Sequence, residues 1–218
     1  MIPQRFVVEY PQRCLKLLEA MEPFARQEQL VGSFSLLVAS ALFTIPYERL
    51  KAKHPLAAGG ADSDLYDALR AVEGKKFLEA DFWNGIQAHD WRFSRIMTSP
   101  ETTRDWKDEK GMHPMGADAG NTIDERKTDA VLRVIRNALA HGNVIYLDKD
   151  GFETVGATVQ YLAFLSRYEE TEEQRKQSET YRLVATTEEG FLAFVKCWAS
   201  WLNGFPPDVR LVFSNAAE

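Results

Sequence analysis

The chain has 218 residues, of which 45% are hydrophobic and 27% are charged. This composition and length predict one globular domain over residues 1–218, with enough apolar residues to bury a core. The net charge of −6 excludes a protein that coats nucleic acid with its whole surface, because such binding needs many phosphate contacts. Any contact with nucleic acid should therefore be local.

The first half of the chain predicts helices. Residues 11–29 form an amphipathic pattern with charges opposite one apolar stripe. That stripe consists of Cys14, Leu17, Leu18, Met21 and Phe24. Residues 30–46 are apolar but interrupted by glycine and serine, which indicates a core helix closed by Ile45–Pro46 rather than a membrane span. A loop at 55–64, a helix from Ser63 and a short strand at 90–97 follow.

Residues 98–120 show little periodicity, and we expect this long loop to be mobile or functional. Its apolar anchors are Trp106 and two methionines, and His113 is expected to be solvated. The only cysteines, Cys14 and Cys197, lie far apart and lack metal-ligand spacing. This pattern favours a reducing, cytoplasmic setting without a disulfide framework or zinc site.

Residues 121–141 give the clearest helical pattern. Thr122 and Glu125 have the spacing of a capping box, and Gly142 suits a left-handed cap at the other end. The expected buried face is made of Ile123, Val131, Leu132, Ile135, Ala138 and Leu139. Beyond the helix, two β-rich runs flank "DKDG", residues 157–170 are ambiguous, and residues 169–179 form an acidic connector.

A strand at 181–187 and a final helix starting at Thr186 or Thr187 complete the chain. The fold class expected from these elements is mainly α. An antiparallel helical bundle would carry a small antiparallel hairpin or sheet, inserted at about residues 143–186 before the last helix.

The stretch "RNALAHGNV" at the end of the 121–141 helix holds the candidate site. Helical spacing predicts a polar outer face composed of Arg133, Arg136, Asn137, Ala140 and His141. The small Ala140 would let a second copy of the helix approach closely. Around a two-fold axis, such a dimer would bring two arginines and two histidines into one cleft.

These residue types suit RNA cleavage. A histidine can remove the proton of a ribose 2′-hydroxyl, and an arginine can grip two phosphate oxygens and stabilise developing charge. Asn137 could orient the histidine or donate to the phosphate, and the chemistry needs no metal or cofactor. The spacing is equally compatible with an ordinary helix end, because the helix dipole alone favours a histidine there.

The full stretch "RNALAHGN" closely resembles the signature of the HEPN superfamily: arginine, a polar residue, three residues, then histidine at the end of a bundle helix. The resemblance implies a HEPN-like antiparallel bundle, a homodimer, and catalytic roles for Arg136 and His141, with Asn137 as the accessory polar residue. Arg133 and Asn143 would contact RNA phosphates. One subgroup, silenced by nucleotidyl transfer, has a tyrosine two residues after the histidine. Here Asn143 stands at that position, and Tyr146 is the nearest tyrosine.

The resemblance implies a metal-independent endoribonuclease that cuts single-stranded RNA by 2′-hydroxyl attack, of a toxin or phage-defence type and with a possible cognate antitoxin. An inactive dimeric module of the same fold, binding RNA, nucleotide or a protein partner, is the alternative. A helical protein without a nucleic-acid role is a third possibility. The acidic connector at 169–179 favours these last two. His89 and Trp91 could stack on a base, although a packing role is the simpler reading.

Overall fold

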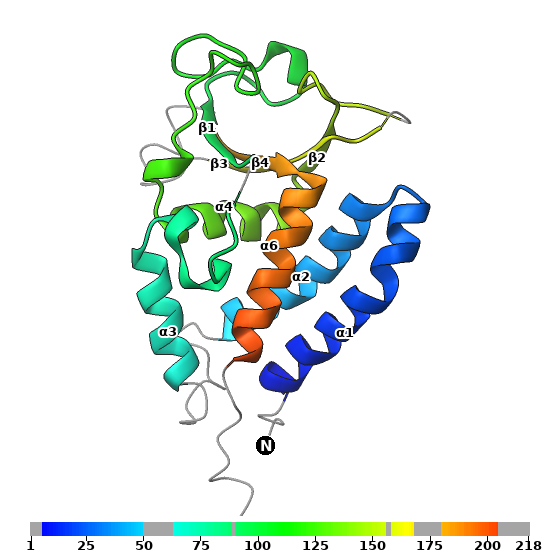
Figure 1. Ribbon diagram of the computed structural model, residues 1–218. Coiled ribbons are helices and arrows are strands. Elements are labelled where there is room, and N and C mark those ends of the chain that lie inside the picture. Colours follow the sequence, from blue (N-terminus) through cyan, green and yellow to red (C-terminus); the bar gives the residue numbers. More distant parts are fainter. Residues whose placement is uncertain (1–5, 50–62, 89, 156–157, 168–179, 205–218) are drawn as a thin grey trace, which may run out of the picture.

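The computed structural model describes residues 6–49, 63–88, 90–155, 158–167 and 180–204. About half of the chain is helical, and the remainder includes one antiparallel sheet (Figure 1). The described helices are α1 (Phe6–Gln27), α2 (Val31–Arg49), α3 (Ser63–Gly74), α4 (Thr128–His141) and α6 (Glu188–Asn203). Short 3-10 turns are η2 (Phe77–Glu79), η3 (Asp81–Trp83), η4 (Thr103–Asp105) and η5 (Ile123–Glu125).

The sheet has four strands in the order β1-β4-β3-β2, each antiparallel to its neighbour. They are β1 (Arg92–Ile96), β2 (Val144–Leu147), β3 (Tyr161–Arg167) and β4 (Tyr181–Thr187). Three of the strands follow α4, of which β2 and β4 were predicted and β3 was left ambiguous, and β1 precedes it. The sheet is therefore larger than the expected insertion, and it is assembled from segments on both sides of α4.

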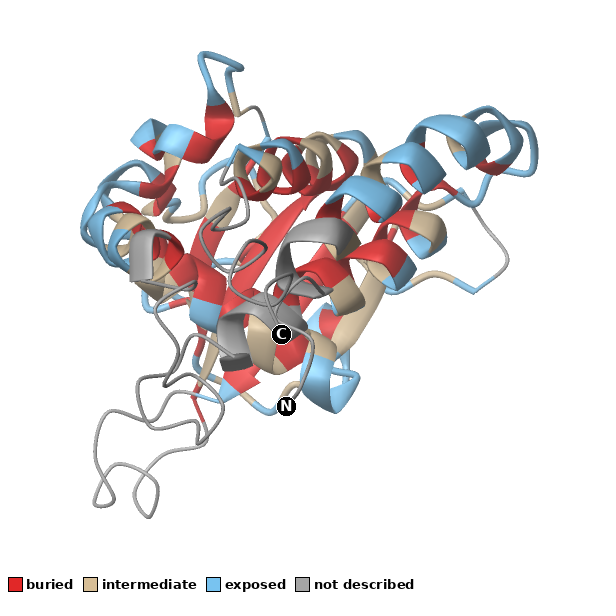
Figure 2. Ribbon diagram, turned by 90° about the horizontal axis from the view of Figure 1, so that it is seen from below, coloured by how far each residue is buried: buried red, intermediate tan, exposed pale blue. Residues whose placement is uncertain are grey.

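The sheet separates two hydrophobic clusters. On one face, Phe93, Phe164 and Val184 join the main core with the helices. On the other face, Leu165 and Leu183 pack in a smaller cluster under the 98–120 loop. Figure 1 shows the helices below the sheet and this loop above it, and Figure 2 shows buried strands behind the helices.

Helix α6 passes through the middle of the main core. Phe194 is 1% exposed and lies at the centre of an aromatic cluster that joins α2, α6 and the segment of residues 77–91. Its ring contacts Phe43, Phe82, Trp83, Trp91, Phe77, Phe191 and Trp198. Thr187 caps the start of α6 by accepting from the Gly190 amide at 3.0 Å, as predicted for one of the two threonines.

Several expected boundaries were wrong. Helix α2 continues through Pro46 to Arg49 instead of ending at it. The Thr122–Glu125 capping box does not form: η5 is a separate turn, and α4 begins at Thr128, after Lys127. The Thr122 hydroxyl instead donates to the Phe93 carbonyl at 3.2 Å, because strand β1 lies beside this segment and offers a non-local partner.

The hairpin prediction was right about the turn and wrong about the partner. Residues 148–151 turn as "DKDG" indicated, with the Asp148 amide donating to the Phe152 carbonyl at 2.8 Å. The run after the turn contributes one bridge, Leu147 to Glu153, whereas the full ladder of β2 is formed with β3. The ambiguous residues 157–170 thus contain a core strand.

The apolar stripe of α1 was only partly a core face. Cys14 and Leu18 are buried, but Leu17, Met21 and Phe24 are 51%, 39% and 55% exposed. Helix α1 packs against α2 and α6 along one side only, so its apolar arc is wider than the surface these helices cover. The loop at 55–64 and the connector at 169–179 lie largely or wholly outside the described residues, and His89 lies outside them.

Candidate functional site

Helix α4 lies between the sheet and the other helices. Its apolar positions recur at helical spacing, and Val131, Leu132, Ile135 and Ala138 are buried as predicted. Gly142 ends the helix with φ 70°, a left-handed conformation that glycine adopts without strain, and its amide donates to the Ala138 carbonyl. The chain then enters β2, which fixes the polar end of α4 beside β3.

Two hydrogen bonds hold the middle of the motif. Asn137 Nδ2 donates to Ser166 Oγ on β3 at 3.1 Å, and an Arg136 guanidinium nitrogen donates to Asn137 Oδ1 at 3.1 Å. Ser166 is itself buried, at 7% exposure. The Asn137 amide therefore bridges the sheet and the guanidinium, and it orients Arg136 from a fixed support.

The end of the motif faces solvent. Ala140 and His141 are exposed, and no described residue forms a hydrogen bond with the His141 ring. Asn143 is also exposed, while its backbone carbonyl accepts from the Leu165 amide at 3.0 Å. The histidine thus stands exposed at the solvent end of α4.

The expected single polar face is divided in the structure. Asn137 leans on Ser166 and is half-buried, so it orients Arg136 rather than His141. Arg133 is exposed and pairs with Asp129 at 2.6 Å, one helical turn earlier. Helical spacing could not reveal this division, because the neighbour that attracts Asn137 comes from a strand 29 residues later.

Two further arginines lie near this site, and sequence reasoning missed both. In the strand register, Ser166 faces Arg182 and Arg182 faces Arg95. These three residues lie two positions from Phe164, Val184 and Phe93, which belong to the helix-side core, so they lie on the same face of the sheet. The alternation of side chains in "RFSRI" and "YRLVATT" indicated which face of each strand its arginine shares. It could not show which strands pair with one another.

Ser166, Arg182 and Arg95 form a row across the sheet, and its two arginines give the site a basic border. Adjacent strands lie about 5 Å apart, so Ser166, Arg182 and Arg95 follow one another across the sheet at that spacing. Arg95 also contacts Glu109 at 2.5 Å and its side chain is 28% exposed.

A separate cavity of about 420 Å³ does not include the motif. It is lined by the second half of α6 and by residues near η3, including Asp81, Lys196, Cys197 and Trp201. Burial raises the pKa of the Cys197 thiol, which makes it a poor nucleophile near neutral pH. The candidate site is therefore a surface site at the end of α4.

Among the described residues, no three histidine, cysteine, aspartate or glutamate side chains group in a way that could hold a metal ion. None of the described helices has the length and apolar character needed to cross a membrane.

A helical layer that presents an arginine and a histidine at the solvent end of one helix is the arrangement expected of the HEPN class. A family model described as HEPN pEK499 p136 matches residues 1–204. The match covers most of the chain, so the chain belongs to this HEPN family. Membership indicates an RNA-related, nuclease-type function, and HEPN domains commonly bind RNA and dimerise. No curated protein and no solved structure matched the chain.

Proposed function

We propose that the protein is a metal-independent endoribonuclease that cuts single-stranded RNA with Arg136 and His141. One observation carries the proposal. The Asn137 amide, anchored to Ser166, holds the guanidinium of Arg136, and His141 is exposed on the next turn of the same helix. The Asn137 amide orients the guanidinium through its carbonyl oxygen, and a guanidinium can also donate to phosphate oxygens.

In the proposed reaction, His141 removes the proton of a ribose 2′-hydroxyl, and the 2′-oxygen attacks the adjacent phosphorus. The bond from phosphorus to the 5′-oxygen breaks, and that oxygen takes up a proton from the protonated His141 or from water. The products carry a 2′,3′-cyclic phosphate and a 5′-hydroxyl. Arg136 stabilises the charge that builds on the phosphate oxygens, because a guanidinium can donate to two of them.

The surrounding residues would hold the RNA strand. Asn143 is exposed next to the end of α4, and Arg133 can contact phosphate if it exchanges its bond to Asp129 for one to RNA. Arg182 and Arg95 lie farther across the sheet, where Arg95 can contact phosphate if it exchanges its bond to Glu109 for one to RNA. The acidic balance of the whole chain favours a short RNA segment over extended coating.

The biological setting that fits this chemistry is a toxin or phage-defence nuclease in the cytoplasm. A homodimer and a cognate antitoxin protein are the partners we propose for it. Asn143, in place of the tyrosine of the subgroup silenced by nucleotidyl transfer, favours control by a bound partner instead of that modification.

The test is cleavage of single-stranded RNA by the purified chain in excess EDTA. We expect 2′,3′-cyclic phosphate ends, and no cleavage of DNA or of RNA with 2′-O-methyl at the cut site. His141→Ala should lower the rate by about two to four orders of magnitude. Arg136→Lys should also fail, because lysine keeps the charge but loses the two-point grip.

A matched control is Arg70→Lys, on the surface of α3. It should leave cleavage unchanged, because Arg70 lies on another helix and pairs with Glu73. Equal cleavage by wild type and His141→Ala would reject the nuclease.

The second candidate is an inactive module that binds RNA, nucleotide or a protein partner. None of the described residues bonds to the His141 ring, which favours this candidate, since in many catalytic sites a second group fixes the histidine tautomer. In this case, wild type would bind RNA without cutting it. Arg136→Ala would then reduce binding, whereas His141→Ala would leave it nearly intact.

A further inference from the structure

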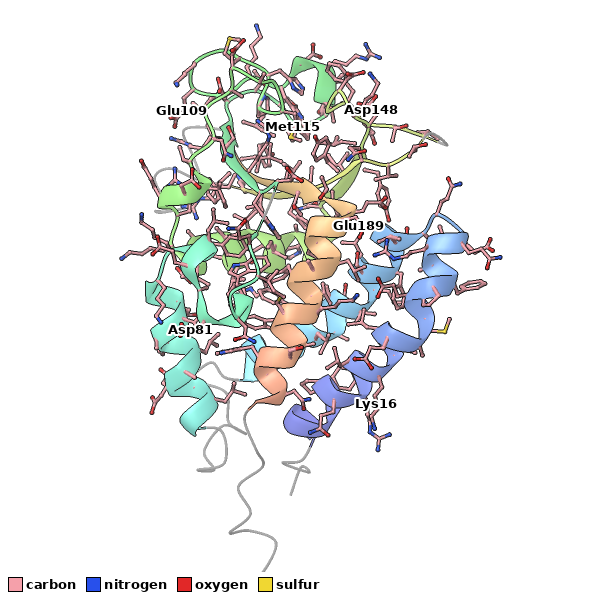
Figure 3. All side chains as sticks on the ribbon, viewed as in Figure 1. Lys16, Asp81, Glu109, Met115, Asp148 and Glu189 are labelled. Atoms are coloured by element: carbon pink, nitrogen blue, oxygen red, sulfur yellow. The ribbon has the colours of Figure 1, made fainter. Side chains whose placement is uncertain are left out.

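A cavity of about 420 Å³ opens between the second half of α6 and residues 81–86, and none of the α4 motif residues line it. Its volume falls in the range of small-molecule sites, which are concave, mostly apolar and carry a few polar groups. Figure 3 shows Asp81 beside α6, in the helical layer below the sheet. The two walls of the cavity therefore come from segments that are far apart in the sequence.

Aromatic and aliphatic side chains form the larger part of these walls. Phe82 is 1% exposed, and the centroid of its ring lies 5.6 Å from that of Trp198 in the main core. On α6, the centroid of the Trp201 ring lies 5.2 Å from that of the same Trp198 ring. Ile86, which is 54% exposed, completes the apolar lining. Because Phe82 and Trp201 pack on one core side chain, the apolar walls are in place before a ligand binds.

The charged side chains of the cavity already have partners. The Asp81 carboxylate accepts two hydrogen bonds from Lys75 Nζ, at 2.7 and 2.8 Å, and Lys196 pairs with Glu22 of α1. Cys197 adds no charge near neutral pH, because burial raises the pKa of its thiol. A charged ligand would have to break one of these pairs or lose water without gaining a partner, which lowers its affinity. The cavity therefore favours an uncharged ligand.

Two uncharged polar side chains remain available in the lining. The Asn84 amide and the Ser200 hydroxyl are exposed, and neither forms a hydrogen bond with the described residues. Asn84 and Gly85 both have positive φ, 47° and 79°, and the Ile86 amide closes this tight turn by donating to the Trp83 carbonyl at 2.9 Å. The turn holds the Asn84 side chain at the cavity, where its amide can both donate and accept.

We infer that this cavity binds an uncharged aromatic compound whose edge carries hydrogen-bonding groups. The ring of the compound lies against Phe82, Ile86 and Trp201, since aromatic rings pack well edge-to-face or offset against such walls. Its polar edge bonds to the Asn84 amide and the Ser200 hydroxyl. The α4 motif takes no part in this binding. The inference therefore stands apart from the proposed nuclease, and its test does not use activity.

The test uses three compounds that share one ring system. Near neutral pH, indole is uncharged, indole-3-acetate is an anion and tryptamine is a cation. In ¹H–¹⁵N spectra of the full chain, indole should shift the backbone amide signals of Asn84, Ile86 and Ser200 saturably, with a dissociation constant of about 0.1–1 mM. Both charged compounds should bind at least about fivefold more weakly, because each must break an existing ion pair or stay unpaired. Absence of a saturable shift at these residues, or equal or tighter binding of either charged compound, would overturn the inference.

Two variants test the assigned contacts. Asn84→Gly keeps the left-handed turn, which glycine adopts freely, but removes the amide, and it should weaken indole binding about fivefold, as expected for one hydrogen bond. Ser200→Phe places a ring in the cavity and should abolish binding. Ser40→Phe is the matched control, because Ser40 is exposed on α2 and does not line the cavity. Circular dichroism confirms that each variant is folded. Indole binding that survives both cavity variants unchanged would belong to another surface and would also overturn the inference.

Discussion

The two faces of the sheet are covered in different ways. The helix-side face packs against α4 and α6, whose apolar residues recur with helical periodicity and belong to the main core. The opposite face is covered by the 98–120 loop, which has no such periodicity and only short 3-10 turns. Burial of apolar side chains stabilises the first covering, whereas hydrogen bonds to a single carboxylate organise much of the second.

That carboxylate belongs to Asp108, which is 5% exposed. It accepts hydrogen bonds from the amides of Lys110, Met112 and Gly120 at 2.8, 2.9 and 3.1 Å. Trp106, 1% exposed, anchors the loop to the sheet. Residues 98–120 are therefore anchored by this carboxylate as well as by Trp106, which the sequence did not predict: apolar periodicity detects packed helices and strands but not a loop arranged around a buried acceptor.

His113 belongs to the same covering. Its Nε2 donates to the Thr103 carbonyl at 2.9 Å, and its ring stacks near Trp106 and tilts against Phe152. The expectation of a solvated histidine was wrong, because the turn after β2 folds over this loop. Figure 3 shows Met115 above the sheet, between the Glu109 side of the loop and the Asp148 turn.

The largest effect should come from the helix-side face. Phe194→Ala removes the ring at the centre of the aromatic cluster and leaves a cavity, which costs about 3–5 kcal/mol of unfolding free energy. Chemical denaturation followed by circular dichroism measures it. A change below about 1 kcal/mol would show that the cluster does not hold the helices together.

On the loop-side face, Asp108→Ala should cost about 2–3 kcal/mol, because three amides lose their acceptor. We expect slow hydrogen exchange of the Lys110, Met112 and Gly120 amides in wild type and fast exchange in the variant. The helices should keep their protection. Fast exchange across residues 98–120 in wild type would show that the loop is mobile after all.

Gly151→Ala should have a smaller effect, of about 1–2 kcal/mol. Gly151 has φ 83°, and an added Cβ would overlap the side chain of Met115. The change therefore pushes the turn after β2 away from the loop. Thermal unfolding of Gly151→Ala is compared with that of Gly111→Ala. Gly111 has φ 75° but open space around it, so the comparison separates backbone strain from the overlap with Met115.

The smallest effect is a dependence on pH. Burial alone would raise the pKa of the Asp108 carboxyl, but the amides of Met112, Gly120 and Lys110 outweigh it, and the pKa lies below the ordinary value. The stability that this carboxylate contributes is therefore complete above the unfolded pKa of about 3.9 and is lost as pH falls through the folded pKa.

Thermal midpoints of wild type and Asp108→Asn should accordingly differ at pH 6 and converge below about pH 4. Asp148→Asn is the matched control, since the amide bonds from Phe152 and Asp150 also lower the pKa of the Asp148 carboxyl, but in a turn at the surface. A constant gap between wild type and Asp108→Asn at all pH values would contradict the role of the Asp108 charge.

The sequence by itself determined what depends on neighbours along the chain. Helical spacing predicted the buried face of α4, Gly142 predicted its left-handed end, and the pair Thr186 and Thr187 predicted the start of α6. These features are local, because a helix closes its own hydrogen bonds within a few residues. The motif Arg136, Asn137 and His141 was visible for the same reason.

Only the tertiary structure decided which of these residues work together. Strand pairing joins positions far apart in sequence, and it placed Ser166 under Asn137 and lined Arg182 and Arg95 up beside it. It also showed that three of the five residues of the α1 stripe face solvent. Periodicity records which residues are apolar, but the packing of α2 and α6 decides how much of that apolar surface is covered.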